Sequence, residues 1–229
     1  MARSFTASTH KVAITAPNPS GYSALTITSW FNIKGTGNAS FDGIVVYSNT
    51  TGMWWQPPSG KILYEAGGGV STGTVTIAAN SGWHHVTLTW VSNVTFSSYI
   101  DGNLDFSTAV SAAPLTSTTT LTLGNDTSTE WLDGYLADCA IWNAALNASE
   151  IAALQTGFRP SSIRPKSLQG YWPLDGIQTT EPDLSGLANN GTVTGAVYTP
   201  GPPVTLLTPR RPFMFLPGIV PTLMPQVCL

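Results

Sequence analysis

The four glutamates of this chain are the first candidates for chemistry, because a pair of carboxylates can hydrolyse a glycosidic bond. They are Glu65, Glu130, Glu150 and Glu181. On a β-strand such a pair would occupy alternate positions, so that both side chains point into one cleft. None of the four lies two or four residues from another. The sequence therefore predicts a protein that is not an enzyme and has no catalytic residue.

Two adjacent histidines, His84 and His85, come next, since imidazoles bind metal ions and transfer protons. Neighbouring side chains point to opposite faces of a strand, so this pair cannot chelate one ion together. His10 is the only other histidine of the chain. The pattern favours a structural role, in which each ring is held by hydrogen bonds.

Trp54-Trp55 is the best candidate for recognition. Alternation along a strand predicts one indole in the core and the other outside. An outward indole on a neutral surface can stack on a sugar or anchor a protein contact. The alternative stays open that a loop or the C-terminal segment covers both, because tryptophan is mostly buried in proteins.

From residue 200 onward the chain is rich in proline and apolar side chains. Proline interrupts a strand ladder and favours an extended chain, yet residues such as Phe213 and Phe215 are too apolar to remain in water. Arg210-Arg211 can pair with a partner's carboxylates or stay solvated. We therefore expect an extended arm over residues 200–229 that lies on a neighbouring protein, with the chain's own surface as the alternative.

The elements that would position these residues are mostly strands. In residues 83–91, Val86, Leu88 and Trp90 alternate with polar residues, which predicts a strand with one apolar face. Asn147 predicts the cap of a single short helix over residues 149–154. Further strands are expected at residues 41–48, 53–56, 61–66, 70–79, 118–123 and 135–142, and around an Asp101-Gly102 hairpin turn.

Composition narrows the class of protein. The length of 229 residues fits one large domain, or one domain with an appendage. Charged residues make up 9% of the chain against about 25% in an average protein, and the net charge is −3, so nucleic acid is not an expected partner. No apolar run is long enough for a membrane span, and the pattern of the first residues predicts no signal peptide. Cys139 and Cys228 are expected to be unpaired thiols made in a reducing cytosol.

Taken in order, these stretches resemble the laminin-G-like branch of the concanavalin A-like lectin/glucanase superfamily. ITSWFNIK resembles its early core strand, GWHHVTLTWV with YIDGNL its central strands, and LDGYLADCAIWNAALNASEI its closing strand and small helix. Residues 170–198 resemble a strand-and-hairpin unit of the family that would add closing strands. The resemblance implies an all-β, two-sheet antiparallel jelly-roll sandwich over residues 1–199 with one short helix, followed by the proline-rich arm.

The same resemblance raises the question of calcium, which many relatives hold at the rim of the sandwich. The family's early acidic pair would fall within residues 6–10, where this chain has no acid. Asp138 matches the family's strand aspartate, and Asp126 and Asp133 are close to it in sequence. These three are weak calcium candidates, and no other cofactor is expected.

Two functions are compatible with these features. The first is a non-enzymatic structural protein of a large assembly, most similar to bacteriophage virion proteins that decorate a capsid or serve a tail, and found in the virion after assembly in the host cytoplasm. Its arm would bind other copies of the chain or a neighbouring virion protein. The alternative is a lectin-like adhesion module that binds a cell-surface glycan.

Overall fold

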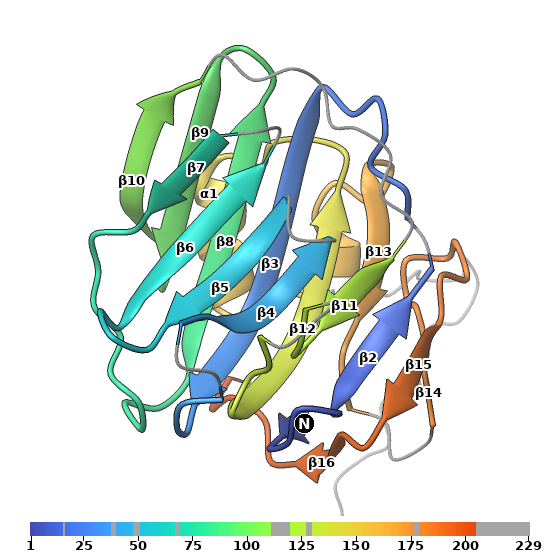
Figure 1. Ribbon diagram of the computed structural model, residues 1–229. Helices are drawn as coiled ribbons and strands as arrows, with labels where there is room; N and C mark the ends of the chain where they lie inside the picture. Colours follow the sequence, from blue (N-terminus) through green and yellow to red (C-terminus); the bar gives the residue numbers. More distant parts are fainter. Residues whose placement is uncertain are drawn as a thin grey trace, which may run out of the picture.

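The computed structural model describes residues 1–15, 17–37, 40–47, 51–66, 69–110, 120–126, 130–175 and 179–204. These residues form two antiparallel sheets of eight strands each, stacked face to face (Figure 1). The expected all-β, two-sheet sandwich with one short helix is confirmed. None of the described helices is both long and apolar enough to span a membrane.

One sheet, called sheet A, contains both the earliest and the latest strands of the chain. Its order is β10 (Asn103–Ala109), β9 (Thr95–Ile100), β8 (His84–Val91), β3 (Ala24–Ile33), β12 (Gly134–Trp142), β1 (Ala2–Phe5) and β16 (Val197–Thr199), and β13 (Leu168–Trp172) pairs with β12.

The other sheet, called sheet B, faces the viewer in Figure 1. Its order is β14 (Thr180–Glu181), β15 (Gly191–Thr194), β2 (Lys11–Ile14), β11 (Leu121–Leu123), β4 (Asp42–Tyr47), β5 (Thr51–Gln56), β6 (Lys61–Ala66) and β7 (Gly69–Thr72). Strands from residues 168–199 thus enter both sheets.

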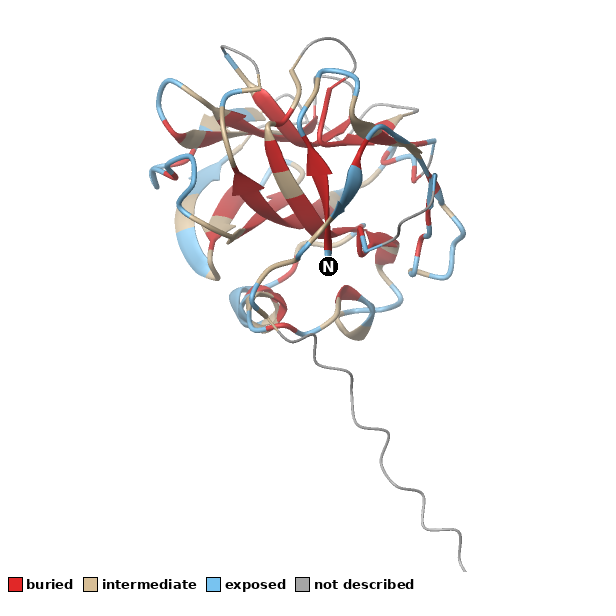
Figure 2. Ribbon diagram, turned by 90° about the horizontal axis from the view of Figure 1, so that it is seen from below, coloured by how far each residue is buried: buried red, intermediate tan, exposed pale blue. Residues whose placement is uncertain are grey.

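The core lies between the two sheets, and alternation determines which side chains reach it. Val86, Leu88 and Trp90 of β8 are fully buried in one apolar cluster, as their spacing predicts. Burial of each such side chain stabilises the fold by about 1.5–3 kcal/mol. Figure 2 shows buried residues along the strands of both layers and exposed residues in the connections. The predicted strand over residues 70–79 is shorter than expected, because the chain leaves the sheet after Thr72.

A β-bulge at Asp138 changes the pattern of β12. Ala137 pairs with Trp30 but Ala140 with Thr28, and Asp138 has a φ of 49°. The sequence predicts Ala137 and Cys139 on one face, whereas Leu136, Cys139 and Ile141 all face the core. The extra residue shifts the alternation by one. It lies where β12 exchanges β1 for β13 as its neighbour.

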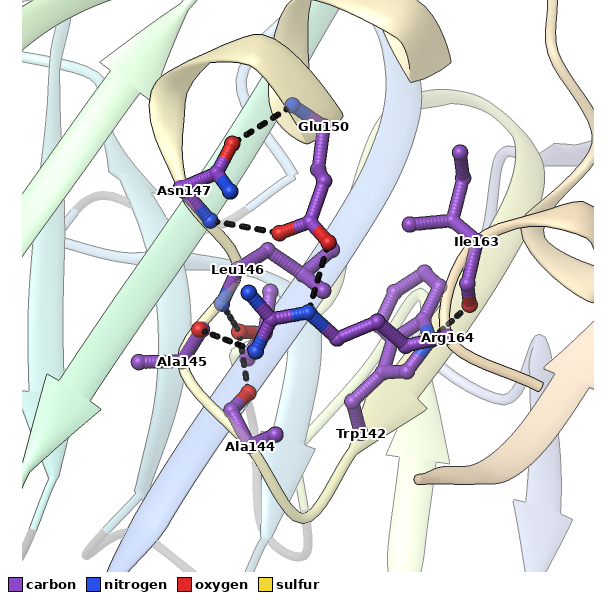
Figure 3. A network of polar contacts seen from close by, with 9 residues as sticks. Trp142, Ala144, Ala145, Leu146, Asn147, Glu150, Ile163 and Arg164 are labelled. Carbon is purple, nitrogen blue, oxygen red and sulfur yellow. Dashed lines mark hydrogen bonds and ion pairs between the residues drawn. The ribbon is translucent and has the colours of Figure 1, made fainter. Parts of the chain in front are cut away.

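Helix α1 (Ala148–Gln155) covers the outer face of sheet A and is fastened there by polar contacts (Figure 3). The Asn147 side chain accepts a hydrogen bond from the Glu150 backbone N–H, and the Glu150 carboxylate accepts one from the Asn147 N–H, which is a capping box. Arg164 then donates to Glu150 at 2.6 Å, just after the 3-10 turn η1 (Pro160–Ser162). The Asn147 cap is as predicted.

Candidate functional site

A cavity of about 170 Å³ opens on the outer face of sheet B. It is lined by Phe41, Trp54, Leu63, Glu65 and Glu130. Leu63 and Glu65 alternate with the core residues of β6, so both point outward, and Leu63 is the registered partner of Trp54 on β5. Two neighbouring strands and two connecting segments therefore supply the lining.

Two glycines let the chain pack closely beneath this cavity. A Cβ on Gly52 would lie 3.2 Å from Cη2 of Trp54, so the indole lies over this position. A Cβ on Gly43 would lie 2.9 Å from the Glu130 carbonyl oxygen. The absence of a side chain at Gly43 allows Asn125, Asp126 and Glu130 to lie against β4, with the Gly43 N–H donating to the Glu130 carbonyl at 3.0 Å. This approach brings Glu130 to the cavity.

The two tryptophans of β5 lie on opposite sides of sheet B. Trp55 belongs to the core, where its Nε1–H donates to the Ile77 carbonyl at 3.0 Å. Trp54 lines the outer cavity, yet only 3% of its surface is exposed, so it offers an edge rather than a broad stacking platform. Its buried Nε1–H has no hydrogen-bond partner among the described residues, although a buried indole usually has one.

Carboxyl groups dominate the electrostatics of the cavity. Burial, followed by the negative charges of Asp126 and Asp42, raises the pKa of Glu130 to about 7. Burial also raises the pKa of Glu65. The Asp126 carboxylate accepts a hydrogen bond from the Glu130 backbone N–H at 3.0 Å, and that of Asp42 accepts one from the Gly37 N–H at 3.0 Å. Near neutral pH, the Glu130 carboxyl can therefore either donate or accept a hydrogen bond.

Sequence reasoning missed that Glu65 and Glu130 line one cavity. The alternation along residues 61–66 is enough to place Leu63 and Glu65 on the same outer face of the strand. The neighbouring strand that carries Trp54 can also be inferred from the sequence. The position of Glu130 depends on a segment that precedes β12 and folds back over β4, for which no short-range signal exists. The linear spacing of glutamates is thus a poor guide to which carboxyls share a cavity.

A second, much smaller cavity lies on the outer face of sheet A, beneath α1. It has room for about one water molecule, at about 10 Å³, and both His85 and Asp138 line it. The His85 Nε2 is 2.8 Å from the Thr28 hydroxyl, and burial lowers the pKa of this histidine to about 4. The Tyr171 hydroxyl donates to Asp138 at 2.6 Å, while burial raises the pKa of Asp138 to about 6.

The remaining predicted site residues do not gather at one place. His84 is turned away from His85, as the alternation predicts, and its Nδ1 is hydrogen-bonded to the Asp101 carboxylate at 2.8 Å. Of the calcium candidates, Asp126 lies beside Glu130, while Asp138 is bonded to Tyr171. The backbone carbonyl of Asp133, the third candidate, accepts from Lys34. Within the described ranges, no three Asp, Glu, His or Cys side chains are grouped as metal ligands.

The C-terminal arm is described only at its beginning. Val204 packs against Ala2, Trp30 and Ala137 on the outer face of sheet A, with Trp83 beside them. The predicted contact residues Arg210, Arg211, Phe213 and Phe215, together with Cys228, lie outside the described residues. The described part of the arm therefore rests on its own domain.

Solved structures share this fold at low sequence identity. A Bacteroides ovatus protein, assigned as carbohydrate-binding by inference, is 18% identical with a TM-score of 0.72; the match covers 90% of this chain and 61% of that protein. A heptameric SAP-like pentraxin from Limulus polyphemus is 15% identical with a TM-score of 0.52, over 67% of this chain and 81% of the pentraxin. The binding domain of botulinum neurotoxin DC, in complex with rat synaptotagmin II, is 17% identical with a TM-score of 0.50. The match covers 63% of this chain and 39% of that protein.

These likenesses establish the fold, and this chain spans less than two thirds of the length of the Bacteroides protein. No curated protein matches the sequence. A family model of the laminin-G type, described as the concanavalin A-like lectin/glucanases superfamily, matches residues 6–152. The match takes in β2 to β12 and the start of α1, which is more than half of the chain. The chain therefore belongs to the concanavalin A-like lectin/glucanases superfamily.

Proposed function

We propose that this protein is a non-enzymatic carbohydrate-binding module whose site is the outer cavity of sheet B. The observation that carries the proposal is the lining itself, in which apolar Phe41, Leu63 and Trp54 stand beside the carboxyls of Glu65 and Glu130. Sugars present apolar ring faces edged by hydroxyl groups, and such a lining is complementary to both. Membership of a superfamily named for lectins supports this choice.

The size of the cavity limits what enters it. Sites for drug-sized ligands usually enclose about 300–1,000 Å³, whereas this cavity holds about 170 Å³. It therefore accepts about one sugar unit, with the rest of a longer glycan outside. The unpartnered Nε1–H of Trp54 is available to a sugar oxygen once small side-chain movements expose it.

The test compares two tryptophan variants on a glycan array and by calorimetry. Trp54→Ala is expected to lose at least about tenfold in affinity, equivalent to about 1.4 kcal/mol. Trp83→Ala is the matched control, because Trp83 lies on the outer face of sheet A. A blank array, or equal losses in the two variants when both remain folded, would contradict the proposal.

Absence of catalysis needs its own assay, because two carboxyls share the cavity. A retaining glycosidase holds its two carboxyl groups about 5–5.5 Å apart on either side of the scissile bond. Here Glu65 comes from β6 and Glu130 from a connecting segment. We expect no release of reducing ends from any glycan that binds, and turnover that disappears in Glu130→Gln would overturn the non-enzymatic assignment.

A second function, a structural role in a large assembly, is supported by a different observation. Val204 anchors the beginning of the arm on sheet A, and 25 residues rich in proline and apolar side chains follow it. We propose that these residues bind another copy of the chain or a neighbouring protein, in the manner of a capsid decoration or tail accessory protein of a bacteriophage virion. The charged fraction of only 9% supports a surface that is packed within such an assembly.

Light scattering separates this second function from the first. The full chain is expected to form oligomers that a chain ending at Val204 does not form. The truncation is placed after Val204 so that the apolar cluster around Trp30 stays covered. A full chain that is monomeric at high concentration, and that binds no particle, would argue against the assembly role.

A further inference from the structure

Among the described residues, the charged groups that line the outer cavity of sheet B or act on its lining are all acidic. Glu65 and Glu130 line it, and the negative charges of Asp42 and Asp126 act on Glu130. The lining contains neither lysine nor arginine, and no cation is among the groups that shift the pKa of Glu65 or Glu130. Lys61 shares the outer face of β6 but is not part of the lining. A bound cation would therefore be attracted by negative charges that no basic side chain of the lining neutralises.

The uncharged part of the lining is also suited to a cation of a particular kind. The face of an aromatic ring attracts a positive charge placed within about 6 Å of its centroid, and Phe41 is the more exposed of the two rings in the lining. The Trp54 Nε1–H requires an acceptor oxygen. A simple metal ion would leave both features unused, whereas an amine attached to an oxygen-rich ring would use them together.

We infer that the cavity formed by Phe41, Trp54, Leu63, Glu65 and Glu130 selects sugars that carry a protonated amino group, such as unacetylated glucosamine units. This inference rests on the proposed carbohydrate-binding function and names its ligand class. The ammonium group would lie between the Glu65 and Glu130 carboxylates, and a ring or hydroxyl oxygen would accept from Trp54. Uronic and sialic acids would be repelled by the same carboxylates.

A dependence on pH follows from this arrangement. The charged groups that act on Glu130 are Asp126 from the loop after β11 and Asp42 from β4, while Glu65 from β6 lines the same cavity. With its pKa near 7, Glu130 is mostly protonated at pH 5.5 and mostly ionised at pH 7.5. A ligand with a permanent positive charge should thus bind about tenfold more tightly at the higher pH.

The decisive experiment uses calorimetry at pH 7.0, where about half of the Glu130 carboxyls are ionised, with glucosamine oligomers and their N-acetylated counterparts, which differ in charge but share the sugar ring. We expect at least about tenfold tighter binding of the glucosamine oligomers, lost in Glu130→Gln and Glu65→Gln. Asp175→Asn, which removes an exposed carboxylate outside the cavity, should bind as the unmodified protein does. Trimethylated glucosamine oligomers provide the pH series, because their charge does not titrate.

The outcomes separate this inference from the function on which it rests. Equal or tighter binding of the N-acetylated oligomers, still dependent on Trp54, would overturn the inference and leave carbohydrate binding intact. Loss of binding in Asp175→Asn as large as in Glu130→Gln would also overturn it, because the selection would then come from net charge. An array without any bound glycan would overturn both.

Discussion

Replacing His85 with glutamine should change how the stability of this protein depends on pH. The imidazole lies in the small cavity beneath α1, with 2% of its surface exposed, and its Nε2 is 2.8 Å from the Thr28 hydroxyl. Its pKa is about 4 in the folded protein against an ordinary value of 6.5, because burial disfavours the charged ring. Between these values the unfolded chain takes up a proton that the folded protein refuses, so stability falls as the pH is lowered.

The size of this effect follows from the two pKa values. Each unit of difference corresponds to about 1.4 kcal/mol, so the contribution of His85 falls by about 2–3 kcal/mol between pH 7.5 and pH 4.5. Asp138 acts in the opposite direction. Its pKa is raised to about 6, so the folded state takes up that proton first and gains stability toward acid. The pKa of Glu130 is also raised, to about 7. The unmodified protein alone would therefore show the sum of all these effects and not that of His85 by itself.

Urea unfolding of the unmodified protein and of His85→Gln, each at pH 7.5 and pH 4.5, isolates the contribution of His85 to the pH dependence of stability. His85→Gln keeps a polar group near Thr28 but cannot titrate, so its stability should fall by about 2–3 kcal/mol less than that of the unmodified protein over this range. The constant offset from altered packing cancels in the comparison. NMR of the imidazole should show no titration of His85 above about pH 5. Equal losses in the two proteins would refute the assignment of a neutral, buried imidazole.

Three further predictions concern stability at neutral pH. Arg3→Met should destabilise the protein by about 3–5 kcal/mol, because it leaves the fully buried carboxylate of Glu181 without the guanidinium that lies 2.6 Å away. Urea unfolding measures the loss, and a value below about 1 kcal/mol would contradict the prediction. Asn147→Ala should lower stability by about 1 kcal/mol through loss of the helix cap, seen in the same assay. Gly124→Ala should cost about 2–4 kcal/mol in thermal unfolding, since its φ is 76° and the new Cβ would lie 2.2 Å from Phe5.

The strand pattern carries most of the fold because one face of each strand must be apolar. Val86, Leu88 and Trp90 reveal the core side of β8 without any tertiary information. The Asp101-Gly102 turn is equally local, since both residues adopt positive φ values of 50° and 77° and join β9 to β10. The sequence thus predicts those strands and turns whose conformation depends on residues close to them in the chain.

Features that depend on distant contacts were not predictable. The bulge at Asp138 exists because β12 changes partners there, and β13 lies 30 residues further along. Alternation separates Trp54 from Trp55 correctly, yet it cannot show that only 3% of Trp54 stays exposed. The position of Glu130 in the same cavity as Glu65 likewise depends on the packing of Glu130 against Gly43. The site is thus mainly a product of topology.

The two proposed functions use opposite outer faces of the sandwich, and this leads to a final prediction. Sheet A is covered by α1 and by the arm at Val204, whereas the outer cavity lies on sheet B, with the apolar core between them. No described contact links Val204 to Trp54. Binding energies at sites without shared partners are independent.

A chain ending at Val204 should therefore bind glycan with the affinity of the full chain, within about twofold, while Trp54→Ala should leave the oligomeric state unchanged. Calorimetry and light scattering on the same two proteins test both halves. If truncation altered glycan affinity tenfold, residues 205–229 would have to reach across to sheet B, and the cavity would be a docking site for the chain's own arm. In that case, the arm and the sugar would compete, and a single face would carry both functions.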